Sequence, residues 1–468
     1  MARVVVVGAG VSGLAAAARL ARLRHDVVVC ERNPGPGGQA GRFERDGFAF
    51  DTGPTLVQLP AGMRDLFIKT GKTAPLESVL DLRPVDPAVR WCFADGTVLD
   101  LPTSRGGATA ALAAALSPAA ARSWHAFLAE GDTVWEQFRQ GFITGPPAAV
   151  SGRRWRSKEE RRRLAALRPA GSLPDLIQRH ISDPRLRQAA AAYSLRLGSD
   201  PRTAPSGAVL WPWLEQTFGS WEVVGGMRVL IDAIAERAAL RGAVLRYDTE
   251  VVRVHRDDDR ISAVQLADGE RLPADVVVAA VDDHVLAGLV GDQPRPAPRS
   301  CSMVTLLVAL RGTADLGAST VSFPADPQAE LRSIFDGDPI DADPTLYLSR
   351  GIAPAGCTAL TVSAAARLGT TMMPASLLAA LDARGHVPSD RLLWCEIRTP
   401  TDLQRSTGAP GGSIAGPALV GRDGLLRAPN ATGVGGLYHV GATAHPGPGL
   451  ALAPLSAALV AETLGRSR

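Results

Sequence analysis

The sequence predicts an α/β fold in which a parallel sheet is assembled from separate segments of the chain, with a second, α+β domain beside it. Three observations indicate this. A β-branched run at residues 3–7 leads directly into a glycine-rich turn and an alanine-rich helix. Further strand and helix patterns lie at residues 221–280, and a last strand, turn and helix follow residue 436. Because 468 residues exceed what one hydrophobic core usually supports, we expect more than one domain.

The first element is a continuous β-branched run at residues 3–7, typical of a parallel strand buried on both faces. The turn Gly8-Ala-Gly10-Val-Ser-Gly13 follows at once, and helix-forming residues 14–23 come next. We expect Gly8 to allow the tight turn and Gly10 to let a pyrophosphate approach the backbone. Gly13 then lets the helix pack closely on the strand.

The start of this helix and the next strand complete a dinucleotide-binding unit. Val11 and Ser12 lie at the helix N-terminus, where unpaired N–H groups and the helix dipole favour phosphates. A second strand, residues 27–30, ends at Glu31, whose carboxylate can accept hydrogen bonds from ribose hydroxyls. Strand, turn, helix, strand and acidic residue together predict a Rossmann-like domain.

The residues after Glu31 indicate which dinucleotide binds. They give the spacing Glu-x5-Gly37-Gly38 and then a turn at Gly53-Pro54. A second glycine-rich turn lets more backbone amides reach a diphosphate than one helix terminus could supply. This continuation resembles the flavin amine-oxidase-like superfamily, and the resemblance implies non-covalent FAD.

The same resemblance suggests further contacts and one departure. It places Arg32, beside Glu31, among the cofactor-binding residues. Amine oxidases usually carry Arg after the glycine pair, whereas this chain has Gln39, which we also expect at the cofactor. Arg42 is a candidate to contact the phosphates in place of the missing Arg.

A middle segment continues the same domain. Gly225-Gly226-Met227 precedes an amphipathic helix, and a short strand and residues 250–254 follow. Residues 261–266 and 276–280, with a turn at Asp268-Gly269, predict a small β-meander. The superfamily resemblance implies that backbone atoms of Val251 meet the adenine; an ordinary core strand position explains Val251 equally well.

The C-terminal segment narrows the resemblance to the carotenoid (phytoene) desaturases, which carry a similar Gly-Ala-x-x-His-Pro-Gly-x-Gly turn before a terminal helix. Here the turn runs from Gly441 through His445 to Gly449-Leu450. It implies that backbone N–H donors face the flavin, where negative charge develops as hydride arrives. For His445 a structural role in the turn is favoured over catalysis.

The resemblance implies a Rossmann-like (GR2-type) FAD-binding domain of discontinuous segments, residues 1–65, 221–290 and 426–468. The remainder, residues 66–220 and 291–425, forms the α+β substrate domain, in which residues 105–215 are a helical lid or a membrane-facing part. Residues 153–168 carry eight basic and two acidic side chains. They could dock on anionic lipid, and a solvated basic helix accounts for them equally well.

Composition excludes several classes of protein and site. Lys plus Arg (50) and Asp plus Glu (47) nearly balance, which gives no support for nucleic-acid binding. The five cysteines are scattered without a CxxC pair, which argues against a metal site or disulfide framework and fits a cytoplasmic location. No apolar run reaches the roughly 18 to 20 residues of a membrane span. Any membrane contact is therefore peripheral, on the inner face of the cell membrane.

The expected function is desaturation of a long isoprenoid, with hydride passing to flavin N5 and quinone or O2 as the electron acceptor. The partner is a lipophilic polyene, and no catalytic residue can be named because the sequence shows no conspicuous acid–base pair. Three alternatives stay open at this point. They are a ketolase, saturase or isomerase of another polyene, an amine or porphyrinogen oxidase, and a non-catalytic flavin-binding partner protein.

Overall fold

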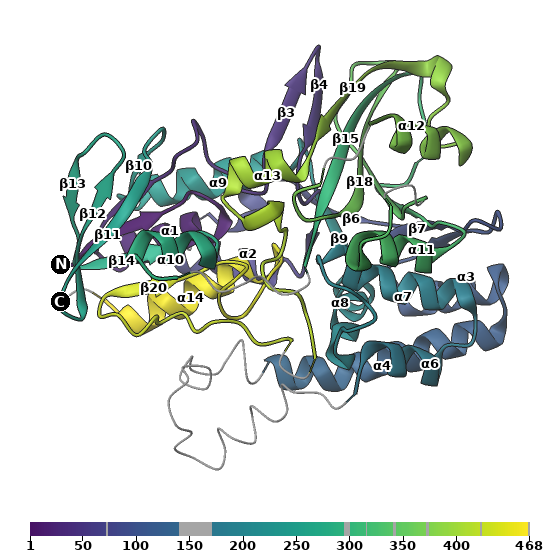
Figure 1. The fold of residues 1–468 in the computed structure, drawn as a ribbon, viewed down its shortest axis with the longest axis horizontal. Helices are drawn as coiled ribbons and strands as arrows, with labels where there is room; N and C mark the ends of the chain where they lie inside the picture. Colours follow the sequence, from purple (N-terminus) through teal and green to yellow (C-terminus); the bar gives the residue numbers. More distant parts are fainter. Residues whose placement is uncertain are drawn as a thin grey trace.

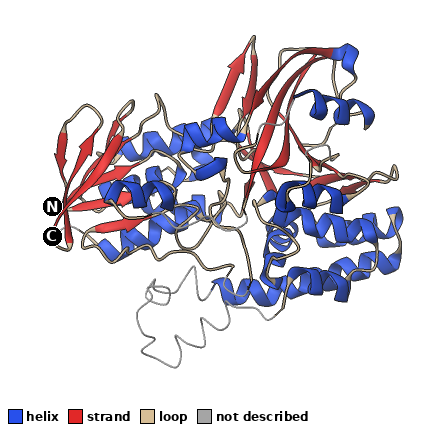
Figure 2. Cartoon of the chain, in the orientation of Figure 1, coloured by secondary structure: helices blue, strands red, loops and turns tan. Residues whose placement is uncertain are grey.

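The computed structural model describes residues 1–71, 74–139, 171–293, 300–314, 316–339, 343–370, 374–421 and 424–466. Its strands gather in two groups, one beside the two chain ends and one on the far side of the molecule (Figure 2). The predicted basic segment, residues 153–168, lies outside the described residues. Within those residues, no helix has the length and apolar character to cross a membrane.

The group beside the chain ends contains a five-stranded parallel sheet in the order β10-β2-β1-β14-β20. Its strands come from three distant parts of the chain: β1 (Arg3–Val7), β2 (Asp26–Cys30), β10 (Val244–Arg246), β14 (Val276–Ala279) and β20 (Leu437–His439). Successive side chains of a strand point to opposite faces. Accordingly Val4 and Val6 enter one hydrophobic core, and Val5 and Val7 enter another.

Each face of this sheet is covered by its own layer (Figure 1). One layer packs α1 against three other helices; the four are α1 (Val11–Arg22), α2 (Ala61–Thr70), α9 (Met227–Leu240) and α14 (Ala453–Leu464). The opposite layer consists of α10 (Asp283–Val290) and a three-stranded antiparallel sheet, β11 (Val251–Asp257), β12 (Arg260–Leu266) and β13 (Arg271–Pro273).

One predicted pairing is wrong. The sequence suggested that residues 276–280 follow residues 261–266 in a β-meander. Instead the turn at Asp268-Gly269 joins β12 to the short strand β13, and β14 lies in the parallel sheet between β1 and β20. The run Val276–Ala279 is buried at every position, as a central parallel strand requires.

The second group is a seven-stranded sheet in the order β19-β15-β18-β17-β16-β7-β8, antiparallel except between β16 and β7. Its strands are β7 (Val89–Cys92), β8 (Val98–Leu101), β15 (Cys301–Arg311), β16 (Ser319–Ser322), β17 (Leu346–Arg350), β18 (Cys357–Arg367) and β19 (Leu392–Arg398). One face is apolar and lies under α12 (Pro374–Ala383). Leu307, Ala309 and Ala359, at alternate positions of β15 and β18, point to the other face, as a period of two requires.

Helices pack beside this sheet around an aromatic-rich core (Figure 1). They are α3 (Arg105–Ala115), α4 (Pro118–Phe138), α6 (Leu173–His180), α7 (Pro184–Arg196) and α8 (Leu210–Phe218). The remaining small strands and helices are β3 (Arg42–Arg45), β4 (Phe48–Asp51), β5 (Val57–Gln58), β6 (Leu82–Val85), β9 (Ser220–Val223), α11 (Pro327–Leu331) and α13 (Pro400–Thr407). The helices in residues 105–139 and 171–215 were predicted; the proposed membrane contact stays a prediction.

Candidate active site

A cavity of about 530 Å³ is lined by residues of both halves of the protein. All the predicted cofactor-binding residues line it, with the exception of Gly13. These are Gly8, Gly10, Val11, Ser12, Glu31, Arg32, Gly37, Gly38, Gln39, Gly53, Pro54, Val251, Gly441, Gly449 and Leu450. Residues from opposite ends of the sequence therefore meet around one space, as the discontinuous segments require.

Two glycine turns lie side by side at one end of this cavity. The N–H of Gly37 donates to the carbonyl of Ala9 at 3.0 Å, and Gly10 forms an isolated parallel bridge with Gly37. A Cβ built on Gly10 would reach only the Cα of Gly38, at 4.0 Å. The backbone of the first turn is thus open toward the cavity, as expected for close approach of a phosphate.

Gly13 does not line the cavity and instead lies where α1 packs against Gly8 and Ala280. A Cβ at Gly13 would lie 2.0 Å from the carbonyl oxygen of Gly8 and 3.0 Å from the Cβ of Ala280. The helix α1 can approach β1 and β14 this closely only because Gly13 has no side chain. Its predicted packing role agrees with this geometry, although Gly13 does not touch the cavity itself.

Glu31 is buried and held firmly at the end of β2. Its Oε2 accepts a hydrogen bond from the Ala9 N–H at 2.7 Å, and its Oε1 accepts from the backbone N–H and side-chain amide of Asn33, at 2.9 and 2.6 Å. A carboxylate offers about four acceptor sites. Glu31 therefore keeps acceptor capacity for a ribose hydroxyl while its orientation is fixed by its own loop.

The C-terminal turn brings a second helix N-terminus to the cavity. The N–H groups of Leu452 and Ala453 both donate to the carbonyl of Gly449, at 3.0 and 3.2 Å. Within the described chain the N–H groups of Leu450 and Ala451 have no acceptor, and both residues line the cavity. Two backbone donors at the start of α14 are thus available to an electron-rich ligand edge.

A buried network holds this turn in place. The side-chain amide of Asn430 donates to the carbonyls of His439 and His445, each at 2.9 Å, and the Ser456 hydroxyl also donates to the His445 carbonyl, at 2.8 Å. The His445 N–H donates to the carbonyl of Ala428. His445 is buried and is not among the cavity-lining residues, in agreement with its favoured structural role.

Comparison with known proteins identifies the family. Residues 11–312 match the family model described as flavin containing amine oxidoreductase. A hydroxyneurosporene desaturase of Cereibacter sphaeroides is 31% identical, over 100% of this chain and 99% of its own. The chain belongs to the flavin-containing amine oxidoreductases, in their carotenoid desaturase branch. A lycopene-forming phytoene desaturase of Pantoea ananas is 28% identical, over 95% of each chain.

Solved structures confirm the fold class of this flavin-containing oxidoreductase. An oxidoreductase from Methanosarcina mazei superposes with a TM-score of 0.61 at 18% identity, covering 98% of this chain and 100% of its own. Cyclohexylamine oxidase from Brevibacterium oxydans gives a TM-score of 0.60 at 17% identity, with 99% of each chain covered. At these identities the likeness concerns the fold alone.

The cavity fits FAD, the cofactor of this flavin-containing oxidoreductase. The open backbone at Gly10 and the N-terminus of α1 suit the diphosphate, and Glu31 suits a ribose. The free N–H groups of Leu450 and Ala451 suit the pyrimidine edge of the flavin. Which of these atoms contact FAD stays a prediction.

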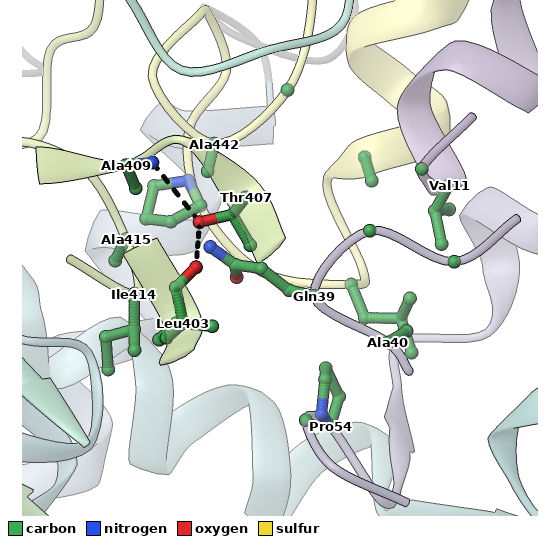
Figure 3. A pocket seen from close by; sticks show the side chains of 18 of the residues that line it. Val11, Gln39, Ala40, Pro54, Leu403, Thr407, Ala409, Ile414, Ala415 and Ala442 are labelled. Atoms are coloured by element: carbon green, nitrogen blue, oxygen red, sulfur yellow. Dashed lines mark hydrogen bonds between the residues drawn. The ribbon is translucent and has the colours of Figure 1, made fainter. Parts of the chain in front are cut away.

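Sequence reasoning missed a wall of this flavoprotein's cavity, formed by α13 and the loop after it. The Arg32 guanidinium donates to the carbonyl of Arg405 at 3.0 Å, and the Asn33 amide donates to that of Ser406 at 3.4 Å. Figure 3 shows the side chain of Gln39 reaching across the cavity toward Thr407. The signal in the sequence was the capping pattern Thr399-Pro-Thr-Asp402, which marks a helix start without indicating its place in the fold.

The suggestion that Arg42 contacts the phosphates is wrong. Its guanidinium donates to the carbonyl of Gly225 at 2.8 Å and pairs with Glu44 at 2.6 Å, and Arg42 does not line the cavity. Instead, Arg42 ties β3 to the glycine turn before α9. Gln39, which follows the glycine pair where amine oxidases usually carry Arg, lines the cavity, whereas Arg42 does not.

One acidic group beside the cavity has a strongly shifted pKa. Burial raises the pKa of Asp282 to about 7, and the neighbouring Asp283 adds to the rise. Asp282 caps α10 by accepting a hydrogen bond from the His284 N–H at 3.0 Å. It lines the cavity after β14. A proton on Asp282 reduces like-charge repulsion if an anionic ligand lies near it.

The other end of the cavity is lined by the seven-stranded sheet and the helices beside it, which form the substrate half of this oxidoreductase. Its apolar lining comes from the C-terminal end of α7, from α8 and β15, and from the loop after α13. The residues are Leu197, Trp211, Leu214, Met303 and Ile414. Polar residues interrupt this lining on the inner face of the seven-stranded sheet, where Thr305 and Ser363 share a hydrogen bond of 3.0 Å. This apolar compartment and the glycine turns expected to hold the flavin belong to one cavity, so a lipophilic ligand bound here would lie next to the cofactor.

Proposed function

We propose that this FAD-dependent oxidoreductase desaturates a long, phytoene-like isoprenoid. The supporting observation is the continuity of one cavity, which runs from the N-terminus of α14 into the compartment lined by Leu197, Leu214 and Met303. Curated relatives with desaturase names, including a zeta-carotene-forming phytoene desaturase of Myxococcus xanthus, cover almost the whole chain.

The reaction removes one hydride and one proton from neighbouring carbons of the polyene and leaves one new double bond. FAD, when bound, supplies the hydride acceptor at N5. The chain's own residues orient both partners: the Leu450 and Ala451 N–H groups stabilise negative charge beside the flavin, and the apolar wall excludes water. The proton would leave with the reduced flavin as FADH2 or pass to solvent, so few protein acids or bases are required, and we assign no catalytic residue.

Three further parts of the proposal rest on the sequence and on the family resemblance. Quinone or O2 would accept the two electrons and restore the oxidised flavin. The enzyme would work in the cytoplasm, at the inner face of the cell membrane where its lipophilic substrate dissolves. Residues 153–168 would supply the basic contact with anionic lipid.

Product analysis tests the proposed reaction. Cells that make phytoene should accumulate products lacking two hydrogens per step, with longer conjugation and visible colour, when they express this chain. A gain of oxygen would instead indicate ketolation, an activity class suggested by the 4,4'-diapolycopene oxygenase of Methylomonas sp, which is 27% identical. Unchanged phytoene despite folded, FAD-loaded protein would contradict the proposal.

A further inference from the structure

The substrate end of the cavity contains a charged and hydroxyl-bearing cluster that a pure hydrocarbon would not need. It combines residues from four elements: Gln58 on β5, Tyr193 and Arg196 on α7, Glu215 on α8, and Tyr347 on β17. All of them except Glu215 line the cavity. Because buried polar groups cost free energy unless they are satisfied, such a cluster calls for a partner.

Most of the cluster is satisfied internally. The Tyr193 hydroxyl donates to Oε1 of Glu215, and the Gln58 amide donates to Oε2 of Glu215 at 3.0 Å. The Tyr347 hydroxyl donates to the carbonyl of Ala192 at 2.9 Å. Burial raises the pKa of Glu215, while the nearby charge of Arg196 opposes that rise. These contacts hold Tyr193 and Tyr347 in place as walls of the cavity.

Among the described residues of the cluster, Arg196 is the one whose side chain has no hydrogen-bond or ion-pair partner. Its guanidinium lies 5.8 Å from the centre of the Tyr347 ring, and no carboxylate of the described chain lies within ion-pair distance. It also has no hydrogen-bond acceptor in the described parts of the chain, although it lines the cavity. Stacking on an aromatic ring orients the guanidinium but leaves its N–H donors free.

A polar row on the sheet continues from this point. Tyr347, Ser363 and Thr305 are direct neighbours across β17, β18 and β15, and all three line the cavity. Side chains at alternate positions of the same strands, such as Val304, Leu346 and Val362, enter the apolar core on the opposite face. The polar face is therefore directed into the substrate compartment by strand register.

We propose that Arg196 donates hydrogen bonds to an oxygen on the end group of the substrate, and that the enzyme acts on oxygen-bearing linear polyenes in preference to hydrocarbons. This inference rests on the proposed function and adds the substrate class to it. A hydroxyl or carbonyl oxygen supplies the acceptor that the guanidinium lacks. The apolar remainder of the polyene substrate then extends toward the glycine turns that line the FAD end of the cavity.

A pair of substrates tests this inference on the FAD-loaded enzyme in detergent micelles: one linear polyene hydrocarbon and its derivative with one terminal hydroxyl group. A charge-assisted hydrogen bond in a site without water changes a binding or specificity constant by roughly 10- to 100-fold. We expect the wild type to give a kcat/KM at least about 10-fold higher for the hydroxylated polyene. In Arg196→Met the ratio of the two values should fall to about one.

Two further variants control the comparison. Arg196→Lys retains a donor and should restore part of the preference. Arg179→Met removes an exposed arginine from the neighbouring helix α6 and should keep the wild-type ratio. Flavin absorbance, measured for each variant, reports that the protein is folded and loaded.

Each other result contradicts the inference. Equal turnover of the two polyenes by the wild type would show that no end group is recognised. A preference that survives Arg196→Met would remove Arg196 from recognition, and loss of flavin from that variant would assign Arg196 to the cofactor. If the wild type oxidises neither polyene, the proposed function fails and the inference falls with it, a result distinct from equal turnover.

Discussion

At the scale of single residues, the glycines of the first turn have separable tasks. Gly10 leaves the backbone open toward the cavity, whereas Gly13 permits contact between α1 and the carbonyl of Gly8. Both roles follow from a motif whose strand, turn and helix are contiguous along the chain, so that the order of residues alone indicates them. Local sequence therefore predicted how these glycines lie in the structure, and their contacts with FAD stay predictions.

The Gly13→Ala variant tests the packing role. The added methyl would lie 2.0 Å from the Gly8 carbonyl oxygen, so α1 must shift. We expect a loss of about 3 kcal/mol in the free energy of unfolding, together with loss of bound FAD. Urea unfolding and flavin absorbance measure the two effects.

Gly288→Ala is the matched control. Gly288 lies within α10, and a Cβ there would meet nothing within 4 Å. This variant should gain up to about 1 kcal/mol from helix propensity and keep its FAD. Equal losses in the two variants would show that the close approach at Gly13 does not matter.

Charged residues were harder to predict than glycines. Arg42 was considered for the phosphates but pairs with Glu44 and the Gly225 carbonyl. Arg196 was not singled out, and it faces the cavity because α7 lies beside Tyr347 of a distant strand. A long, flexible side chain can reach several partners, and only tertiary packing decides among them.

At the scale of elements, α13 links the substrate half to the flavin half. Its last residues accept hydrogen bonds from Arg32 and Asn33, which directly follow Glu31. The first turn of α13 is fixed by a capping box between Thr399 and Asp402. We expect α13 to retain FAD by closing one side of the cavity.

The Asp402→Ala variant tests this closure. Asp402→Ala removes the N3 half of the capping box, and the loss of a capping hydrogen bond costs about 1 kcal/mol, or roughly 5-fold in an equilibrium constant. We therefore expect the Kd of Asp402→Ala for FAD to be about 5-fold higher than that of the wild type. Fluorescence of released flavin on dilution measures this constant.

Asp175→Ala supplies a control with the same chemistry. Asp175 forms the equivalent capping box with Ser172 at the start of α6, away from the cavity. This variant should lower the Tm slightly without changing the Kd for FAD. Equal weakening of FAD binding by both variants would contradict a specific role of α13.

Element prediction failed where pairing is long-range. The run at residues 276–280 was recognised as a strand, yet its partners β1 and β20 lie more than 150 residues away in sequence. Strand propensity does not specify a partner, and a nearby turn at Asp268-Gly269 made the local meander attractive. The seven-stranded sheet, which joins β7 near residue 90 to β16 near residue 320, was likewise beyond local patterning.

At the scale of the whole molecule, two sheets meet around one cavity. The parallel sheet contributes glycine turns and helix N-termini, and the mixed sheet with its helices contributes an apolar wall with a polar row. The sequence motifs predicted the first contribution from three separate segments. The second depends on register and packing across distant strands, which explains why sequence motifs did not identify its residues.

The most direct test of this account is anaerobic titration of the FAD-loaded enzyme with a linear polyene. The account predicts that the oxidised flavin absorbance is bleached, with one new carbon–carbon double bond formed for each flavin reduced. A primary amine should leave the spectrum unchanged. Bleaching by the amine and none by any polyene, hydrocarbon or hydroxylated, would contradict the joint placement of flavin and polyene in this cavity.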